Sequence, residues 1–282
     1  MIVFNDVWKM MDSFQLKGVS ASIPDGYICA LAGQNGAGKT TFLNLLLGLY
    51  RQDKGTLLID GMNYSDDEKT IHDMMGAVLV DELMNAELSL KENGLLYGGY
   101  YSRFDNDKYT GLLLEFNLQP KTRFGRLSKG EKLKCQFAFA LACEPKYLVL
   151  DEPTANFDPE FRQDFLRLIS DFVADGKRSV ILASHLMEDL DRYADYIIYF
   201  DEGNLVYSGD IESFRDKYRI VSGEKYKINL INKDNIIHME ERKYGAKALV
   251  RHGIGTDYDK ALQVTYPSLE EFMYYYSKRV KR

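Results

Sequence analysis

A short stretch, GQNGAGKTT at residues 33–41, constrains the fold of this chain more than any other feature. It contains the pattern G-x-x-x-x-G-K-[ST], at Gly33, Gly38, Lys39 and Thr40, between the apolar runs YICALA and FLNLLLGLY. Glycines allow a tight turn in which successive backbone N–H groups point inward and can bind phosphate oxygens. We therefore expect a strand, a phosphate-binding loop and a helix, in this order.

The residues of this loop have distinct expected roles. The helix that follows would add the positive end of its dipole to the phosphate site. Lys39 is expected to reach the β- and γ-phosphates of a nucleotide, and the Thr40 hydroxyl to bind Mg²⁺. A chance glycine-rich turn is the alternative, which the strand–loop–helix context disfavours. The residues expected to contact the nucleotide are Gly33, Gln34, Asn35, Gly36, Ala37, Gly38, Lys39, Thr40 and Thr41.

Short apolar runs alternate with helical segments over the first two-thirds of the chain. Nearly continuous hydrophobicity is typical of strands that are buried on both faces of a parallel sheet. Such an alternation predicts a doubly wound α/β fold. The runs are TLLID (56–60), MGAVLV (75–80), YLVLD (147–151), SVILAS (179–184) and YIIYF (196–200).

Helical patterns fill two further parts of the chain. Between YLVLD and SVILAS, apolar residues recur at helical spacing, and Gly176 follows as a stop signal. These residues are Phe161, Phe165, Leu168, Ile169 and Phe172. Residues 84–143 also have a helical pattern with little strand character, which predicts a helical insertion between two halves of the core.

The pattern changes near residue 220. Short strand-like runs precede a final predicted helix, SLEEFMYYYSKRV. The runs are KYKINLI, NIIHM, ALVRHGIG and ALQVTYP. We therefore predict a main domain at residues 1–219 and a small α+β appendage at residues 220–282.

Composition argues against several classes of protein. The chain has 282 residues and a net charge of −6, whereas a dedicated nucleic-acid binder usually has a basic excess. No apolar run approaches the ~20 residues that a membrane-spanning helix needs. Cys29, Cys135 and Cys143 show no CxxC spacing, so we expect reduced core residues of a cytosolic protein.

Two acidic residues, Asp151 and Glu152, end the run YLVLDEP. A carboxylate at the end of a buried strand, as Asp151 is expected to be, is suited to a position near Mg²⁺. Glu152 could orient or deprotonate the water that attacks the γ-phosphate. The alternative is a strand that ends in solvated acids, and the phosphate-binding pattern in the same chain favours the catalytic interpretation.

The order and spacing of these motifs resemble those of the ATP-binding subunits of ABC transporters, over residues 1 to about 220. The motifs are GQNGAGKTT, LSKGE (127–131), YLVLDEP, ANFD (155–158) and His185 in ILASHLMEDL. The resemblance implies an α/β P-loop NTPase (RecA-like) core with an antiparallel β subdomain, a helical insertion and a small C-terminal appendage. It also implies that the chain hydrolyses ATP, with Mg²⁺ as cofactor.

The resemblance implies a dimer that closes around two ATP molecules. The Ser128 hydroxyl and the Gly130 N–H would contact the γ-phosphate of ATP bound to a second subunit, which is either an identical or a related chain. His185 would contact the γ-phosphate and help to position water. The catalytic residues implied are Lys39, Glu152 and His185, and the metal ligands are Thr40 and Asp151.

The chain departs from the family pattern at four places, one of which is ANFD (155–158), where S-x-L-D is more common and Asp158 is kept. The glutamine expected near Mg²⁺ falls on Val80, and either Asp81 or Glu82 could replace it. Lys129 and Glu131 replace a glycine and a glutamine of the signature LSGGQ. The position of the aromatic residue that usually stacks on adenine falls on Met10 or Met11. Trp8 and Phe14 flank this position, so any of these side chains is a candidate to cover the base.

The signature and the ending PSLEEFM resemble those of subunits that serve ABC-2 type exporters. This implies a peripheral protein at the cytoplasmic face of the cell membrane, whose partner is an integral membrane permease and not a nucleic acid. A helix of that partner would dock beside residues 80–105. Tyr97, Tyr100, Tyr101 and Phe104 are candidates to line this groove, or they pack within the insertion.

Two other functions are compatible with the site. One is a soluble ATPase of the ABC type that acts on ribosomes or DNA, although such proteins usually have two nucleotide domains or a long coiled coil. The other is a degenerate nucleotide-binding regulator, which only the missing glutamine near Val80 supports.

Overall fold

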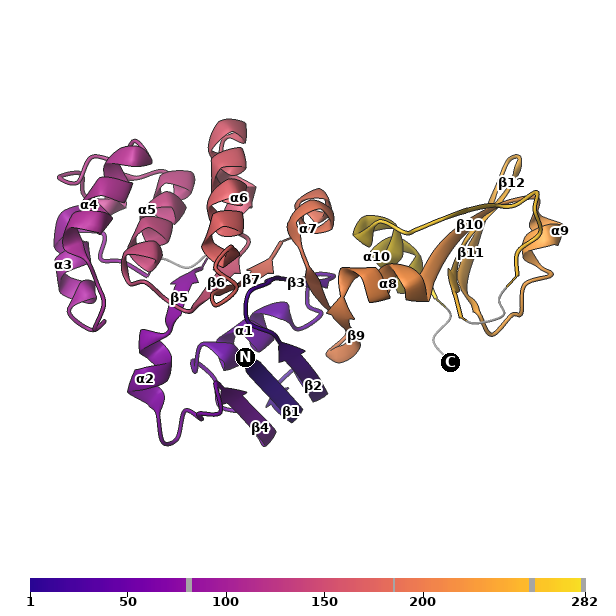
Figure 1. The fold of residues 1–282 in the computed structure, drawn as a ribbon, viewed down its shortest axis with the longest axis horizontal. Coiled ribbons are helices and arrows are strands. Elements are labelled where there is room, and N and C mark those ends of the chain that lie inside the picture. Colours follow the sequence, from indigo (N-terminus) through magenta and orange to yellow (C-terminus); the bar gives the residue numbers. More distant parts are fainter. Residues whose placement is uncertain (80–82, 185, 254–256, 280–282) are drawn as a thin grey trace.

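The structure, a computed structural model, describes residues 1–79, 83–184, 186–253 and 257–279. Within these ranges the strands form a six-stranded, a three-stranded and a four-stranded sheet. Figure 1 shows the helices α3, α4 and α5 at one end of the molecule and the four-stranded sheet at the other. The six-stranded sheet lies between them. The fold is of the α/β class, as predicted.

The six-stranded sheet has the order β5-β6-β7-β3-β8-β9. The strands from β5 to β8 are parallel, and β9 is an antiparallel edge strand. Every residue of β3 and β7 is buried, which explains why these runs are continuously apolar. The bounds are β3 Ile28–Gly33, β5 Met75–Val78, β6 Tyr147–Asp151, β7 Ser179–Ala183, β8 Tyr196–Asp201 and β9 Asn204–Asp210.

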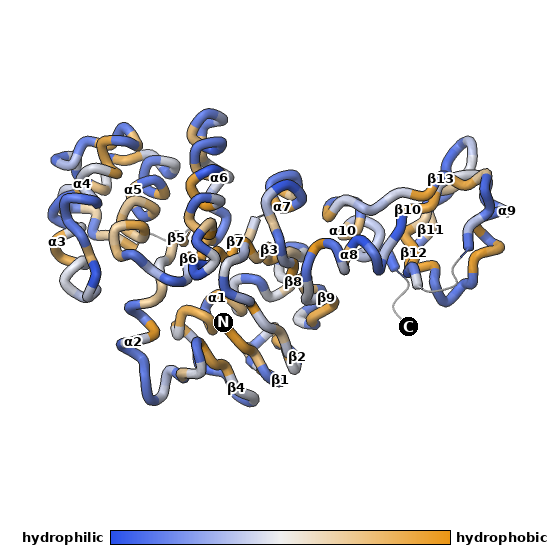
Figure 2. Tube along the Cα trace, in the orientation of Figure 1, coloured by the Kyte–Doolittle hydropathy of each residue, from blue (hydrophilic) through white to orange (hydrophobic). Residues whose placement is uncertain are grey.

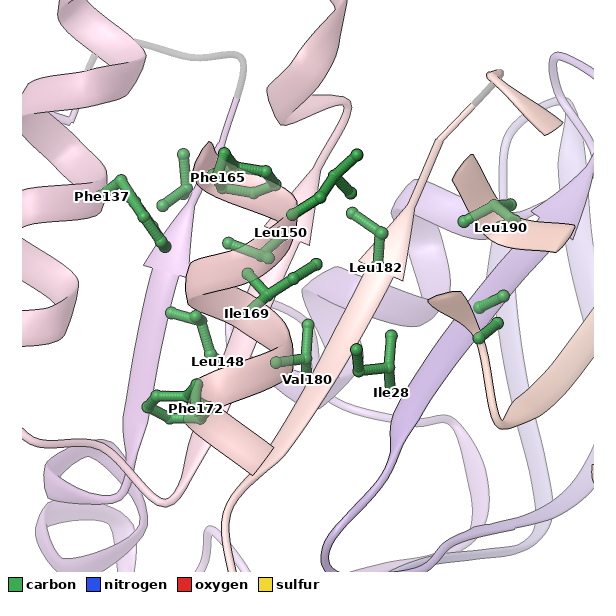
Figure 3. Close-up of a cluster of buried hydrophobic side chains, with 14 of the residues drawn as sticks. Ile28, Phe137, Leu148, Leu150, Phe165, Ile169, Phe172, Val180, Leu182 and Leu190 are labelled. Atoms are coloured by element: carbon green, nitrogen blue, oxygen red, sulfur yellow. The ribbon is translucent and has the colours of Figure 1, made fainter. Parts of the chain in front are cut away.

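Helices cover both faces of this sheet. On one face α6 (Pro159–Val173) directs Phe165, Ile169 and Phe172 toward the strands (Figure 3). Apolar and polar residues alternate along α6 at helical spacing (Figure 2). On the other face α1 (Lys39–Leu46) buries its own apolar residues against alternate positions of the same strands. Helix α7 (Met187–Tyr193) follows β7.

The three-stranded sheet corrects one prediction. It has the order β2-β1-β4 and is antiparallel. The run TLLID, expected in the parallel sheet, ends β4 and pairs with β1 instead. Only Leu57 and Ile59 of β4 are buried, because this strand has a single covered face. The bounds are β1 Ile2–Met11, β2 Phe14–Ile23 and β4 Lys54–Ile59.

The segment with the helical pattern contains three α-helices. Serine begins two of them: Ser89 caps α3 and Ser128 caps α5, each with a glutamate three residues later that bonds back to the serine N–H. The buried side chains of Cys135 and Cys143 lie in or directly after α5, and Cys29 is buried in β3. The bounds are α2 Glu68–Asp73, α3 Leu90–Gly98, α4 Asn106–Glu115 and α5 Lys129–Ala142, with 3₁₀ helices at Phe124–Arg126 and Pro153–Asn156.

The four-stranded sheet is antiparallel, with the order β11-β12-β10-β13. The run KYKINLI was predicted to be a strand, but its first residues form helix α9. Ile228 and Ile231, three residues apart, both point into the small core of this sheet, which is helical spacing. The bounds are β10 Tyr218–Gly223, β11 Ile236–Arg242, β12 Gly245–Arg251, β13 Gln263–Thr265, α8 Ile211–Lys217, α9 Lys225–Ile228 and α10 Leu269–Ser277.

The last helix, α10, returns from this sheet to the main core. The ring of Phe272 lies 5.1 Å from Tyr199 of β8, 4.9 Å from Phe214 of α8 and 4.7 Å from Tyr218, between ring centroids. Phe272 therefore belongs to the same buried cluster as α6. Throughout the described ranges, no helix has the length and apolar character needed to cross a bilayer.

Candidate functional site

The loop between β3 and α1 has the backbone that the glycine pattern predicts. Gly33, Gly36 and Gly38 have positive φ angles of 150°, 78° and 114°. A Cβ atom on Gly33 would lie 2.6 Å from the carbonyl oxygen of Phe200, and one on Gly38 would lie 2.8 Å from the ring of Phe14. Residues 34–36 are exposed, so their backbone is open to a ligand. The geometry suits a phosphate group.

Lys39 begins helix α1 and lies against this loop. Its ammonium group donates hydrogen bonds to the carbonyl oxygens of Gly33 (2.7 Å) and Gln34 (3.2 Å). Burial lowers the pKa of Lys39, and the nearby carboxylates of Glu152 and Asp151 oppose that shift. The positive charge therefore faces the two acids that the sequence predicted to share its site.

The two acids follow from the end of β6. Asp151 is the last residue of that strand and pairs with Ala183 of β7, and the Glu152 N–H donates to the Ala183 carbonyl oxygen (2.9 Å). Glu152 has a φ of 49°, an uncommon conformation for this residue type. Because β6, β7 and β3 are parallel, the carboxylates reach the sheet edge where the loop at 33–41 begins. Carboxylate and threonine oxygens are ligands that Mg²⁺ accepts.

Several predicted site residues lie outside the residues that the structure describes: Val80, Asp81, Glu82 and His185. The residues that are candidates to contact adenine lie within the ranges that the structure describes. Met10 and Met11 are 52% and 41% exposed at the end of β1, whereas Phe14 packs against Gly38 of the loop. Trp8 donates its indole N–H to Asp6 (3.0 Å).

The signature residues lie on a different helix from Lys39. Ser128 and Gly130 are at the start of α5, which stands apart from α1 in Figure 1. The Ser128 N–H donates to the Glu131 carboxylate (2.8 Å), and hydrogen bonds from Ser128 lower the pKa of Glu131. Ser128 is exposed, so a second molecule can reach it.

A largely apolar groove separates the helical segment from the sheets. Two adjoining hollows, of about 310 and 610 Å³, share Met75, Ala77, Leu83, Tyr100 and Tyr101 in their walls. Tyr97 lines the first hollow, as predicted. Phe104 does not line it: its ring packs inside the insertion, 5.3 Å from Phe139 and 5.8 Å from Tyr109. Tyr100 is 77% exposed.

Comparison with known proteins identifies the family. A profile described as "ABC transporter" matches residues 16–155. The chain is 32% identical over 214 residues to the Nod factor export ATP-binding protein I of Burkholderia lata, which covers 74% of this chain and 70% of that protein. The chain belongs to the ABC transporter family. As an ABC ATP-binding subunit, it binds ATP and is an ATPase.

Other similarities agree with this assignment. The chain is 32% identical to the energy-coupling factor transporter ATP-binding protein EcfA2 of Clostridium perfringens, over 73% of this chain and 76% of that protein. The fold matches the dimeric ATP-binding cassette MJ0796, bound to ADP and Pi, with a TM-score of 0.67 and 22% identity over 75% of this chain and 99% of that one. The predicted ABC ATPase fold is thereby confirmed.

Sequence reasoning missed one cleft that lies beside the phosphate-binding loop. An open cleft of about 520 Å³ beside Gly33, Gln34 and Asn35 is also lined by residues of α7 and α10. These residues are Met187, Glu270, Met273 and Tyr274. Helix α10 comes more than 200 positions later in the chain than the loop, so no local pattern could have predicted its place beside it.

Proposed function

We propose that this chain is the ATP-hydrolysing subunit of a transporter, that it dimerises around two ATP molecules, and that it powers export through a separate integral membrane subunit. The proposal rests on one observation: Lys39 lies close to Asp151 and Glu152 at one edge of the parallel sheet. A phosphate-binding loop and two acids at this edge are the parts that ATP hydrolysis requires.

Each residue of the site has a role in this proposal. The backbone N–H groups of residues 33–41 bind the phosphates, and Lys39 neutralises the β- and γ-phosphates. Thr40 and Asp151 hold Mg²⁺, which would neutralise charge that develops on the phosphates. Glu152 acts as general base toward the attacking water, and His185 contacts the γ-phosphate.

The proposed dimer rests on the place of Ser128. Helix α5 begins in the helical segment, apart from α1. Ser128 and Gly130 are therefore better placed to contact ATP bound to another chain than ATP bound to their own chain. Each ATP then lies between the loop 33–41 of one chain and the signature of its partner. The second chain is either identical or related.

The apolar groove is the proposed contact with the membrane subunit. We assign to it an amphipathic helix of that subunit, because the walls are rich in tyrosine and aliphatic side chains, with Tyr100 and Leu83 exposed. The chain would thereby be held at the cytoplasmic face of the membrane. Nucleic acid is not a proposed partner, since the net charge is −6.

The direction of transport is part of the proposal. Export is supported by the similarity to a protein named for Nod factor export and by the PSLEEFM ending, which resembles ABC-2 type exporters. The similarity to an energy-coupling factor protein extends over a comparable length.

We assign residues 1–219 to the ATP-binding domain, with its helical part at about 84–143, and residues 220–282 to the appendage.

Turnover and oligomeric state test the enzymatic part. Glu152→Gln should bind ATP with wild-type affinity, lose hydrolysis by about 100-fold or more, and elute as a dimer in the presence of ATP and Mg²⁺. Lys39→Ala should lose ATP binding. The matched control is Glu115→Gln, an exposed glutamate at the end of α4, which should behave as wild type. A Glu152→Gln variant that hydrolyses ATP normally, or stays monomeric with ATP, would contradict the proposal.

Membrane association tests the groove. Tyr100→Glu should reduce the share of the chain that fractionates with host membranes, because it places a charge in an apolar contact. Tyr244→Glu is the control: this side chain is 88% exposed and lies between β11 and β12, away from the groove. Equal membrane fractions for the two variants would rule out the groove as the docking site.

A further inference from the structure

The first turn of helix α10 is hydrogen-bonded to α7. The Leu269 N–H, at the start of α10, donates to both carboxylate oxygens of Asp191, at 3.0 Å each. Asp191 belongs to α7, which also provides Met187 to the cleft beside the phosphate-binding loop. A charge-assisted hydrogen bond therefore joins the start of α10 to α7.

Arg279, two residues after the end of α10, is bonded to the central sheet. The Arg279 guanidinium donates to the carboxylate of Asp201, the last residue of β8, at 2.6 Å. Asp201 is only 7% exposed, and Arg279 also stacks on the ring of Tyr276, 3.9 Å from its centroid. A buried carboxylate depends strongly on its cation, because the desolvated charge is costly when unpaired.

Asp201 leads into a turn that touches the phosphate-binding loop directly. Two residues later, the Gly203 N–H donates to the Ala37 carbonyl oxygen (3.0 Å), and the Gly203 carbonyl oxygen accepts from the Lys17 N–H (2.9 Å). A Cβ atom on Gly203 would lie 1.8 Å from the Gln15 carbonyl oxygen. The turn after Asp201 is therefore packed between β2 and the loop, and Gly203 bonds to both.

The middle of α10 forms a wall of the cleft beside the loop. Met273 and Tyr274 line it together with Gly33, Gln34 and Asn35. The Tyr274 hydroxyl donates to Glu240 of β11 (2.9 Å), which ties this wall to the four-stranded sheet. Helix α10 is therefore joined to α7 at its start and to β11 through Tyr274, and it faces the loop across this cleft.

We propose that Arg279 is a positioning residue for ATP binding: through Asp201 and Gly203 it holds the phosphate-binding loop in its binding conformation. The proposal rests on the loop at 33–41 being the ATP site. Arg279 touches neither Lys39 nor the acids, so it should affect affinity for ATP and leave the chemical step largely unchanged. A loop that must be ordered on binding costs affinity, whereas a preordered loop does not.

The test compares nucleotide affinity and turnover in the full chain. Arg279→Met should raise the Kd for a fluorescent ATP analogue by about threefold to tenfold, with kcat at saturating ATP within about twofold of wild type. Asp201→Asn should do the same, and the double variant should be no worse than either single one. Arg279→Lys, which keeps the charge, should lie between wild type and Arg279→Met.

A matched control exists at the far end of the sheet. Arg178 also pairs with an aspartate, Asp175 (3.0 Å), and also lies on an aromatic ring, 4.6 Å from the centroid of Phe172. It precedes β7, at the edge of the sheet opposite the loop. Arg178→Met should therefore leave the Kd for the analogue unchanged, whatever it does to the melting temperature.

The outcomes are separable from those of the proposed function. If wild type binds the analogue and Lys39→Ala does not, the ATP site stands. A Kd for Arg279→Met and Asp201→Asn equal to that of Arg178→Met then overturns the positioning role alone. If Arg279→Met does not fold, hydrogen exchange of residues 33–41 in Arg279→Lys decides: exchange faster than wild type supports the role, and unchanged exchange overturns it. Wild type that does not bind overturns both.

Discussion

The guanidinium group of Arg162, in α6, binds both carboxylate oxygens of Asp189, in α7, at 2.7 and 3.0 Å. Asp189 is 6% exposed. Helix α6 follows the segment that contains Asp158, and α7 follows the segment that contains His185. The ion pair therefore joins the two helices that continue from these predicted site segments.

Removing this arginine should destabilise the protein. Arg162→Met leaves the buried carboxylate of Asp189 without its cation, and we expect the free energy of unfolding in urea to fall by about 2 kcal/mol. The control is Arg167→Met on the same helix, whose ion pair with Asp164 is exposed at 3.5 Å and should contribute less than about 0.5 kcal/mol. Equal losses in the two variants would contradict the prediction.

The loop glycine Gly38 should be intolerant of alanine. Its φ of 114° is strained for an L-residue, and a Cβ atom would lie 2.8 Å from the ring of Phe14. Gly38→Ala should therefore lower the free energy of unfolding by about 1–3 kcal/mol and weaken ATP binding.

Gly111 provides the opposite case. It lies within α4 and is exposed, and a methyl group at this position would meet open space. Gly111→Ala should stabilise the chain by about 0.5–1 kcal/mol, since alanine is the better helix former. Urea titrations measure the free energy of unfolding of both variants. A Gly38→Ala variant as stable as wild type would contradict the prediction for Gly38.

The carboxylate of Glu131 should weaken the ATP-dependent dimer. It accepts from the Ser128 N–H at the start of α5, where the proposed partner's γ-phosphate would approach. Glu131→Gln keeps an acceptor for this hydrogen bond and removes a negative charge, so half-maximal dimerisation should need about two- to fivefold less ATP. Because hydrogen bonds from Ser128 lower the pKa of Glu131, its carboxylate is ionised at neutral pH, and the gain should be equal at pH 6 and pH 8.

The control for this change is Glu92→Gln. Glu92 caps α3 with the same geometry, accepting from the Ser89 N–H at 2.8 Å, but lies outside the signature. It should leave dimerisation unchanged. Light scattering at a series of ATP concentrations measures the dimerisation of both variants. If Glu131→Gln needs more ATP than wild type to dimerise, the expected repulsion between Glu131 and the γ-phosphate is refuted.

Asp60 should stabilise the protein at neutral pH and lose this effect in acid. Burial alone would raise the pKa of Asp60, but hydrogen bonds from Lys146 and Tyr147 help to lower it to about 2. A depressed carboxyl pKa stabilises the fold above the unfolded value of about 3.9, and the effect disappears as the pH falls toward 2. Since solvent screens this partly exposed group, Asp60→Asn should cost about 1 kcal/mol at pH 7.

The measurement is urea unfolding of wild type and Asp60→Asn at pH 7, 4 and 2.5. The difference between them should be constant from pH 7 to about 4.5 and should shrink at lower pH. Asp12→Asn, which changes an exposed carboxylate in the turn after β1, is the control and should show no difference. A gap that does not depend on pH would show that Asp60 acts through packing.

The sequence alone determined the local parts of this protein. The glycines and Lys39 specify the loop, because positive φ angles and a helix start depend on residues a few positions apart. Helix α6 was predictable from Phe161, Phe165, Ile169 and Phe172, which are all buried. Leu168 is only half-buried, since Leu166 takes the position facing the core.

Tertiary structure alone decided which of these parts meet. Periodicity shows that a face is buried, but not what covers it, so β4 joined the antiparallel sheet and residues 225–228 became a helix. The contacts that join α10 and the residues after it to α7 and β8, from Leu269 to Asp191 and from Arg279 to Asp201, each join residues 78 positions apart. Such contacts form only when separate layers pack together, because neither partner's local sequence carries any trace of the other.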